Sequence, residues 1–244
     1  MARTRRGRPG AAVRRPGVNV PALPFLPQAV IFDMDGLMLD SERAITRCLS
    51  KAANEQGHAI EPAFWLRMVG KGDAACRAML AERIGDDAGQ VLLDRCHVLY
   101  DEVVEAGVPL RPGILALLDL LVARRIPRAV ATSTRRPLAL RKLAAADLLR
   151  RFDTVCTSSD VVHPKPAPDI YLLAAERLRV APAQCLVLED SPTGVRAALA
   201  AGMTPIQVPD LLAPDEEVRA MGHRIVNSLS DAQKLLELRL EAGA

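Results

Sequence analysis

Residues 29–42 read AVIFDMDGLMLDSE, and this stretch decides the fold. It opens on an apolar, β-prone run, which predicts a buried strand over residues 28–34. The strand carries two acids, Asp33 and Asp35, to the same place. Two carboxylates about 4 Å apart repel each other by about 4 kcal/mol at an effective dielectric near 20. We therefore expect a positive charge next to the two carboxylates, either a side chain from another segment or a cation from solution.

Beyond residue 110, short apolar runs alternate with Ala- and Leu-rich stretches of helical period. We predict strands at 128–131, 154–156, 184–188 and 204–208, and helices at 114–125, 137–146, 169–178, 191–201 and 229–240. This alternation is typical of an α/β fold, here a Rossmann-like parallel sheet core flanked by helices.

Between the first strand and this alternation, the pattern is helical throughout. A helix is predicted at 41–56, with Ser41 as its N-cap, and only helical periodicity follows as far as residue 107. We therefore expect a small all-helical cap domain at 44–109, inserted into an α/β core domain made of 28–43 and 110–244.

The N-terminal segment 1–27 differs in composition from the rest of the chain. It holds six arginines, no acid and several Pro and Gly residues. Such a segment cannot bury enough apolar surface to fold, so we predict a disordered Arg-rich tail. The tail lacks the apolar core of a secretory signal.

Composition also narrows the possible partners and location. Aromatic residues make up 3% of the chain, too few for the stacking platforms of single-stranded nucleic-acid binders, so we expect no nucleic-acid partner for the folded part, and only the basic tail offers a contact for one. No apolar run approaches the roughly 20 residues that span a bilayer, which excludes a membrane partner. The five cysteines form no CxxC pair and indicate reduced thiols in a cytoplasmic protein. Nothing in the sequence indicates an oligomeric state.

Polar residues follow several of the predicted strands. In parallel sheets, ligands bind outside the carboxyl ends of the strands, so these residues should converge. The set comprises Asp33 and Asp35, the TST segment Thr132–Thr134, Lys165 in HPKPAPD, and the pair Glu189 and Asp190. The convergence makes the prediction specific, because each piece alone would be weak.

The predicted cluster has too much negative charge for one lysine to balance. Oxygen ligands without a nearby His or Cys suit Mg²⁺, which leaves room for a substrate phosphate. We predict metal contacts from Asp33, Asp35, Asp190 and Glu189, although Glu189 could instead lie behind the ligands. A phosphate would be held by Thr132, Ser133 and Lys165, through side chains and backbone N–H groups.

The same residues supply a nucleophile. The chain has neither a GxxxxGK[ST] loop for ATP nor a GxSxG elbow. A carboxylate can itself attack phosphorus, and Asp33 at the strand end is the candidate. Asp35 can protonate the leaving oxygen and later deprotonate the attacking water.

Together, the DMDG, TST, Lys165 and ED segments, in this order, resemble the haloacid dehalogenase-like superfamily of phosphohydrolases, in its helical-cap branch. The resemblance spans about residues 28–228. It implies that Asp33 is nucleophile and metal ligand, and that Asp35 is acid/base and binds the metal through its carbonyl. It also implies a phosphoryl site at Thr132 and Lys165 and a metal ligand at Asp190. Asp35 is present, which disfavours the family's dehalogenase and phosphonate-hydrolase chemistries.

These observations favour a Mg²⁺-dependent phosphatase acting on a small phosphorylated metabolite, such as a sugar phosphate, a nucleotide-like phosphate or phosphoglycolate. A mutase of the β-phosphoglucomutase kind shares the same core residues and remains an alternative. A non-catalytic binding protein that uses the Arg-rich tail is a further alternative, which the intact acid pair disfavours. Lys71, in the cap turn VGKGD, either reaches over the site to select the substrate or is a surface lysine.

Overall fold

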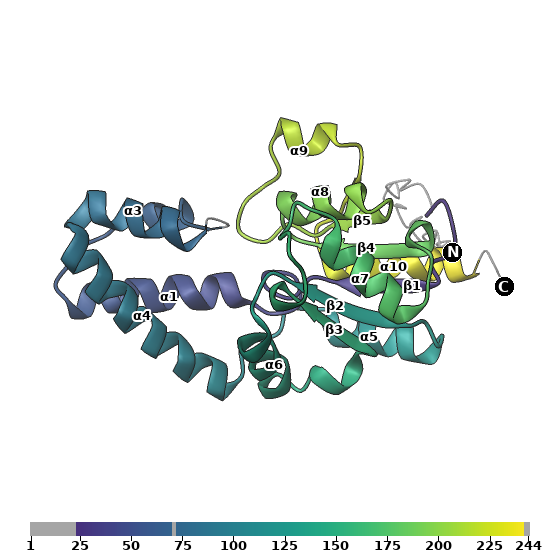
Figure 1. The fold of residues 1–244 in the computed structure, drawn as a ribbon, viewed down its shortest axis with the longest axis horizontal. Helices are drawn as coiled ribbons and strands as arrows, with labels where there is room; N and C mark the ends of the chain where they lie inside the picture. Colours follow the sequence, from purple (N-terminus) through teal and green to yellow (C-terminus); the bar gives the residue numbers. More distant parts are fainter. Residues whose placement is uncertain (1–22, 70–71, 242–244) are drawn as a thin grey trace, which may run out of the picture.

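The computed structural model describes residues 23–69 and 72–241 (Figure 1). Its strands are β1 (Ala29–Phe32), β2 (Arg128–Thr132), β3 (Thr154–Thr157), β4 (Cys185–Glu189), β5 (Thr204–Gln207) and β6 (Arg224–Ile225). Its helices are α1 (Ser41–Glu55), α2 (Pro62–Leu66), α3 (Asp73–Ile84), α4 (Asp86–Ala106), α5 (Ile114–Ala123), α6 (Arg136–Ala145), α7 (Asp169–Leu178), α8 (Pro192–Ala200), α9 (Glu216–Ala220) and α10 (Leu229–Glu241).

The strands form one parallel six-stranded sheet in the order β3-β2-β1-β4-β5-β6. This confirms the predicted Rossmann-like core. β1 lies at the centre, where both of its neighbours cover its backbone, and this explains why its residues 29–32 are apolar throughout. The order changes direction between β1 and β4, and ligands of such sheets bind at that switch point.

The two faces of the sheet are covered by different helices. Val30 and Phe32 pack into the layer of α5, α6 and α10, whereas Ala29 and Ile31 pack against α7 and α8. All four side chains are fully buried. Successive residues of a strand point to opposite faces, so one short apolar run supplies both hydrophobic layers.

Helices α1 to α4 lie between β1 and β2 in the chain and form the cap (Figure 1). The cap has a hydrophobic core of its own, which includes Trp65, Leu80, Leu92 and Leu99. In Figure 1 it stands to one side of the sheet and its flanking helices, as predicted for an inserted helical cap.

Where the chain leaves the core for the cap, the prediction that Ser41 caps the first cap helix was wrong. Ser41 is not the N-cap of α1, because the N-cap residue is Asp40 and no side chain caps the helix. The Ser41 hydroxyl instead accepts a hydrogen bond from the backbone N–H of Gly36, 3.2 Å away. Gly36 has a φ of +79°, so the serine stabilises the turn after β1 instead of the helix start.

Two sequence predictions fall wholly or partly on residues outside the described ranges. They are Lys71 and the first 22 residues of the predicted tail 1–27. Leu23, at the start of the described chain, is buried in the core. Within the described ranges, no helix is both long and apolar enough to cross a membrane.

Candidate active site

A cavity of about 580 Å³ lies at the carboxyl ends of the central strands and faces the cap. Six of the predicted site residues line it: Asp33, Asp35, Thr132, Ser133, Lys165 and Asp190. Glu189 lies behind this lining and is fully buried. The parallel topology has thus brought together residues that are up to 157 positions apart in the chain, since Asp33 and Asp190 share one cavity (190 − 33).

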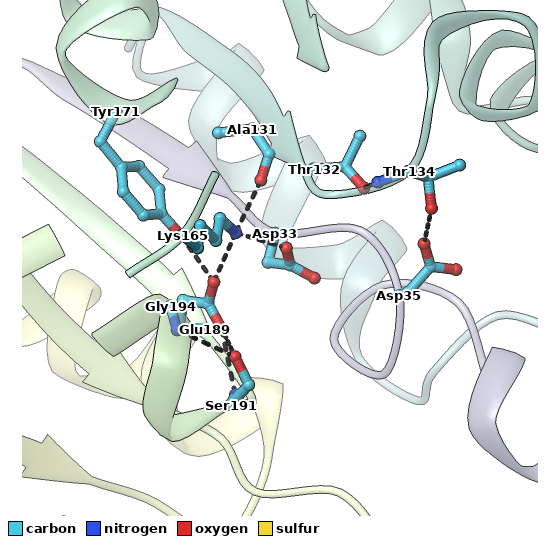
Figure 2. A network of polar contacts seen from close by, with 10 residues as sticks. All are labelled: Asp33, Asp35, Ala131, Thr132, Thr134, Lys165, Tyr171, Glu189, Ser191 and Gly194. Carbon is cyan, nitrogen blue, oxygen red and sulfur yellow. Dashed lines mark hydrogen bonds and ion pairs between the residues drawn. The ribbon is translucent and has the colours of Figure 1, made fainter. Parts of the chain in front are cut away.

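Lys165 is the central cation of the site (Figure 2). Its ammonium donates to Asp33 Oδ1 at 2.7 Å and to Glu189 Oε1 at 2.6 Å, and its third bond goes to the backbone carbonyl of Ala131 at 3.0 Å. These bonds use all three donors of the ammonium. The acids raise the pKa of Lys165 well above its ordinary value despite burial, so the side chain stays charged.

Both carboxylate oxygens of Glu189 accept two hydrogen bonds each. Oε1 accepts from Lys165 and from the Tyr171 hydroxyl at 2.6 Å, while Oε2 accepts from the backbone N–H and the hydroxyl of Ser191, both at 3.0 Å. Burial alone would raise the pKa of Glu189, but Lys165 and these hydrogen bonds lower it below its usual value. Glu189 therefore positions Lys165 and the start of α8.

Asp33, Glu189 and Asp190 each place a carboxylate oxygen within 4.8 Å of the others. Burial, together with neighbouring negative charge, raises the pKa of Asp33 to about 7 and that of Asp190 well above its usual range. Within the described ranges, the Asp190 carboxylate has no hydrogen-bond or ion-pair partner. Two acids that are unfavourable when ionised, one of which has no partner, fit a bound hard cation, which would reverse both pKa shifts.

Asp35 lies in a different electrostatic setting from Asp33. Lys142 Nζ donates to its Oδ1 at 2.8 Å and the Thr134 hydroxyl to its Oδ2 at 2.6 Å. Burial would raise the pKa of Asp35, but these two partners lower it below its ordinary value. Without a bound metal, the pKa values of two acids that are two positions apart are thus shifted in opposite directions.

The anion-binding part of the site comes from the end of β2. The buried Thr132 hydroxyl oxygen accepts from the backbone N–H of Thr134 at 3.1 Å, which leaves its proton available to an anion. Ser133 is exposed beside it and lines the cavity. The segment therefore offers hydroxyl donors next to the ammonium of Lys165.

Sequence reasoning missed two residues of this network, Lys142 and Tyr171. Both are buried, one on α6 and one on α7. Lys142 lies three positions after Ala139 and next to Leu143, both of which are fully buried. A lysine on the apolar face of a helix was the signal that could have revealed it, because a buried ammonium requires an acidic partner.

The family of the chain follows from a comparison with family models. The model of haloacid dehalogenase-like hydrolases matches residues 27–202, which is most of the chain and includes every predicted site residue. This chain is a haloacid dehalogenase-like hydrolase. The match confirms the resemblance drawn from the motifs, and the family is one that generally uses a metal ion, in keeping with the acidic cluster.

Curated relatives of this hydrolase include several named phosphatases. It is 32% identical to a phosphorylated carbohydrates phosphatase of Thermotoga maritima over 211 residues, which are 86% of this chain and 90% of the relative. It is 34% identical to hexitol phosphatase A of Escherichia coli over 179 residues, or 73% and 81% of the two chains.

Solved structures agree with the fold of the hydrolase. A putative β-phosphoglucomutase from Thermotoga maritima superposes with a TM-score of 0.75 at 30% sequence identity. The match covers 87% of this chain and 98% of the other. The sheet and the cap are therefore present in both proteins.

Proposed function

We propose that this hydrolase is a Mg²⁺-dependent phosphatase that cleaves a small phosphorylated metabolite, such as a sugar phosphate, through an aspartyl phosphate on Asp33. The observation that carries the proposal is the convergence of Asp33, Asp35, Thr132 and Lys165 in one cavity, where the Lys165 ammonium lies 2.7 Å from Asp33 Oδ1. The names of the relatives support this reaction class, since they include phosphatases of phosphorylated carbohydrates and hexitols.

The first step forms the phosphoenzyme. Asp33 attacks phosphorus, the bond to the leaving oxygen breaks, and Asp35 gives that oxygen a proton. Lys142 keeps Asp35 ionised in the ligand-free protein, but the negative phosphoryl group opposes this effect and favours the protonated acid. Substrate binding and protonation of Asp35 are therefore coupled.

The second step returns the enzyme to its starting form. Asp35, now a carboxylate, takes a proton from water, the water oxygen bonds to phosphorus, and the bond to Asp33 breaks. Thr132, Ser133 and Lys165 hold the phosphoryl oxygens during both steps, and Lys165 must exchange one of its three present bonds to do so.

Asp33 and Asp190 are the residues that would hold the metal, with the Asp35 carbonyl as a third contact. A bound Mg²⁺ would neutralise the carboxylates and the incoming phosphate. Glu189 contributes by orienting its neighbours, because both of its oxygens already accept hydrogen bonds.

We also infer the division of the chain into a core domain of 28–43 and 110–244 and a cap domain of 44–109. The separate hydrophobic core of the cap supports this division. A cytoplasmic location is supported by the five cysteines, all of which are free in the structure.

A sugar phosphate mutase is the second candidate, and the similarity to a putative β-phosphoglucomutase favours it. In a mutase, a second sugar hydroxyl replaces water as the acceptor of the phosphoryl group. Incubation with β-glucose 1-phosphate and its bisphosphate separates the two reactions, because a mutase forms glucose 6-phosphate and a phosphatase releases inorganic phosphate.

The test of the proposed function is turnover of p-nitrophenyl phosphate with and without Mg²⁺. We expect wild-type activity to depend on the metal, and both Asp33→Asn and Asp35→Asn to lower kcat by at least about 100-fold. Wild-type turnover in both variants would show that the reaction occurs elsewhere. A panel of phosphorylated metabolites then identifies the substrate.

A further inference from the structure

A buried amide, that of Gln207, lies at the carboxyl end of β5 beside the catalytic cavity. Gln207 pairs with Glu189 of β4 in the sheet and is one of the residues that line the cavity. The residue is 1% exposed, although it carries two polar side-chain atoms. Buried polar atoms are nearly always hydrogen-bonded, so the partners of this amide indicate what the residue does.

The Gln207 amide connects two residues that are 33 positions apart (223 − 190). Its Nε2 donates to the backbone carbonyl of Asp190 at 3.0 Å, and its Oε1 lies 2.8 Å from His223 Nε2. A carbonyl can only accept, so the amide turns its NH₂ group toward Asp190 and its oxygen toward the imidazole. His223 Nε2 must then carry the proton that Oε1 accepts. The result is a chain of hydrogen bonds that runs from His223 through Gln207 to Asp190.

The other ring nitrogen of His223 agrees with this arrangement. Nδ1 is buried and has no hydrogen-bond partner within the described ranges. A proton on Nδ1 would leave an unpaired N–H and a charge in this place, and burial lowers the pKa of His223 below its usual value. The ring is therefore neutral at about pH 7, with its proton on Nε2, where Gln207 needs it.

The place of the Asp190 carboxylate depends on its backbone, because no described residue bonds to the carboxylate itself. On one side the carboxylate packs against the turn after β1, where a Cβ on Gly36 would lie 2.3 Å from Asp190 Oδ2. On the other side, the Asp190 carbonyl accepts a hydrogen bond from Gln207 and from no other described residue. Gln207 is thus the polar contact that fixes this peptide.

We propose that Gln207 and His223 are positioning residues for the metal. Gln207 holds the Asp190 peptide so that its carboxylate meets the cation together with Asp33, and His223 holds the Gln207 amide in the required orientation. This role rests on the proposed function, because it needs the metal site at Asp33 and Asp190. Partners that orient metal ligands typically change metal affinity by about 10–100-fold when they are removed.

The first test measures Mg²⁺ binding to the substrate-free protein by titration calorimetry at about pH 8, where protons compete least for the carboxylates. Gln207→Leu removes both hydrogen bonds and should raise the Kd at least about tenfold. His223→Leu leaves the bond to Asp190 but frees the amide, so the Kd should rise at least about threefold. His223→Gln should restore the affinity, because its amide can place an N–H where His223 has Nε2.

A double variant tests whether the two residues act in sequence. If His223 acts only through Gln207, the protein with Gln207→Leu and His223→Leu should bind Mg²⁺ no more weakly than the one with Gln207→Leu alone. Losses in binding free energy that add up across the two substitutions would overturn the proposed chain.

The matched control is Ser228→Ala, which also removes two side-chain hydrogen bonds, here between Ser228 and Asp231 at the start of α10. Ser228 contacts neither Asp190 nor the catalytic cavity, so this variant should lower the Tm and leave the Kd for Mg²⁺ unchanged. Circular dichroism checks that each variant is folded. If Gln207→Leu lowers the Tm and keeps the wild-type Kd, the amide serves the fold alone and the proposal is wrong.

The second test uses turnover of p-nitrophenyl phosphate at varied Mg²⁺. In Gln207→Leu, the apparent KM for Mg²⁺ should rise at least about tenfold, and kcat at saturating Mg²⁺ should fall much less. A fall in kcat with an unchanged KM for Mg²⁺ would contradict a role in metal binding. A wild-type protein that binds Mg²⁺ but cleaves no phosphomonoester would instead count against the proposed function, and the binding comparison would still decide the role of Gln207 and His223.

Discussion

At the scale of single residues, the most informative contact is the one between Lys142 and Asp35. The lysine is almost completely buried and its ammonium lies 2.8 Å from the carboxylate. No other lysine or arginine is bonded to Asp35 in the described part of the chain. Asp35, the proposed acid/base residue, therefore depends on a helix that contributes no residue to the cavity lining.

Replacing Lys142 by Met should damage both activity and stability. Without the ammonium, burial raises the pKa of Asp35 and the carboxylate can no longer act as a base near neutral pH. We expect kcat to fall at least about tenfold and the free energy of unfolding to fall by about 2 kcal/mol. Enzyme kinetics and urea unfolding measure the two effects.

Lys142→Arg is the control, since it keeps the positive charge at the same place on α6 and should retain more of both properties than Met. A Met variant with wild-type kcat and an unchanged urea midpoint would show that the contact matters neither to Asp35 nor to the fold.

The raised pKa values of Asp33 and Asp190 predict how metal binding depends on pH. Each acid holds its proton in the folded, metal-free protein at pH values where the unfolded chain has released it. Their contribution to stability is complete below the ordinary pKa of 3.8 and is lost as the pH rises through about 7 for Asp33. The metal must displace these protons, so a higher pH favours it.

We therefore expect the Kd for Mg²⁺ to fall at least about tenfold between about pH 5.5 and about pH 8, with release of protons on binding. Over the same range the Tm of the metal-free protein should fall, and Mg²⁺ should restore it. Titration calorimetry in buffers of different ionisation enthalpy measures the protons. A Kd that is independent of pH would mean that Asp33 is ionised before the metal arrives.

At the scale of elements, the backbone of α8 at Gly194 lies so close to the Glu189 carboxylate that no side chain fits at this position. A Cβ placed on Gly194 would overlap the carboxylate of Glu189. Ser191 caps the helix by accepting a hydrogen bond from the backbone N–H of Gly194. Because Gly194 has no side chain, the first turn of α8 can pack directly against the buried Glu189 carboxylate.

Gly194→Ala should push Glu189 away from Lys165. We expect a loss of at least about tenfold in kcat and of about 1–3 kcal/mol in the free energy of unfolding, because the added carbon has no room. The control is Gly89→Ala in α4, where the nearest atom is Leu80 Cβ at 3.3 Å. Calorimetry and kinetics should show a much smaller effect there; equal effects would refute the close-packing argument.

Most strands and helices could be predicted from the sequence because the apolar pattern that identifies each one lies within its own residues. β1 is apolar on both faces and sits in mid-sheet, so its run of four residues was sufficient to find it. β6 and α9 have two and five residues, which is too short for a period to appear. Ser41 misled because its hydroxyl bonds back to the turn at Gly36, a contact that depends on the strand and not on α1.

At the scale of the whole molecule, a cluster of ion pairs lies where the chain passes between the core and the cap. Asp210, in the segment after β5, accepts from Arg43 of α1 and from Arg111 after α4, both at 2.5 Å. Arg43 also bonds to Asp40 at 2.8 Å. Both connections between cap and core are thus held to the same buried carboxylate, that of Asp210.

The catalytic half of the site could be predicted because topology alone brings it together. Asp33, Thr132 and Asp190 each lie at the carboxyl end of a strand of one parallel sheet, so their convergence needed no side-chain detail. The packing of α1 to α4 decides which faces meet within the cap, and no local pattern revealed the cavity of about 240 Å³ that Glu42 and Trp65 help to line. The sequence therefore predicts the residues that would carry out the reaction, but it does not predict the shape of the pocket that receives the leaving group.

The central claim is that Asp33 carries the phosphoryl group, and the Asp35→Asn variant tests it most directly. p-Nitrophenolate leaves without an acid, so this variant should form the phosphoenzyme but lack the base that hydrolyses it. After brief incubation with p-nitrophenyl phosphate and Mg²⁺, mass spectrometry should find one phosphoryl group, on the peptide that contains Asp33. A phosphoryl group on any other residue, or its formation in an Asp33→Asn, Asp35→Asn double variant, would contradict the mechanism.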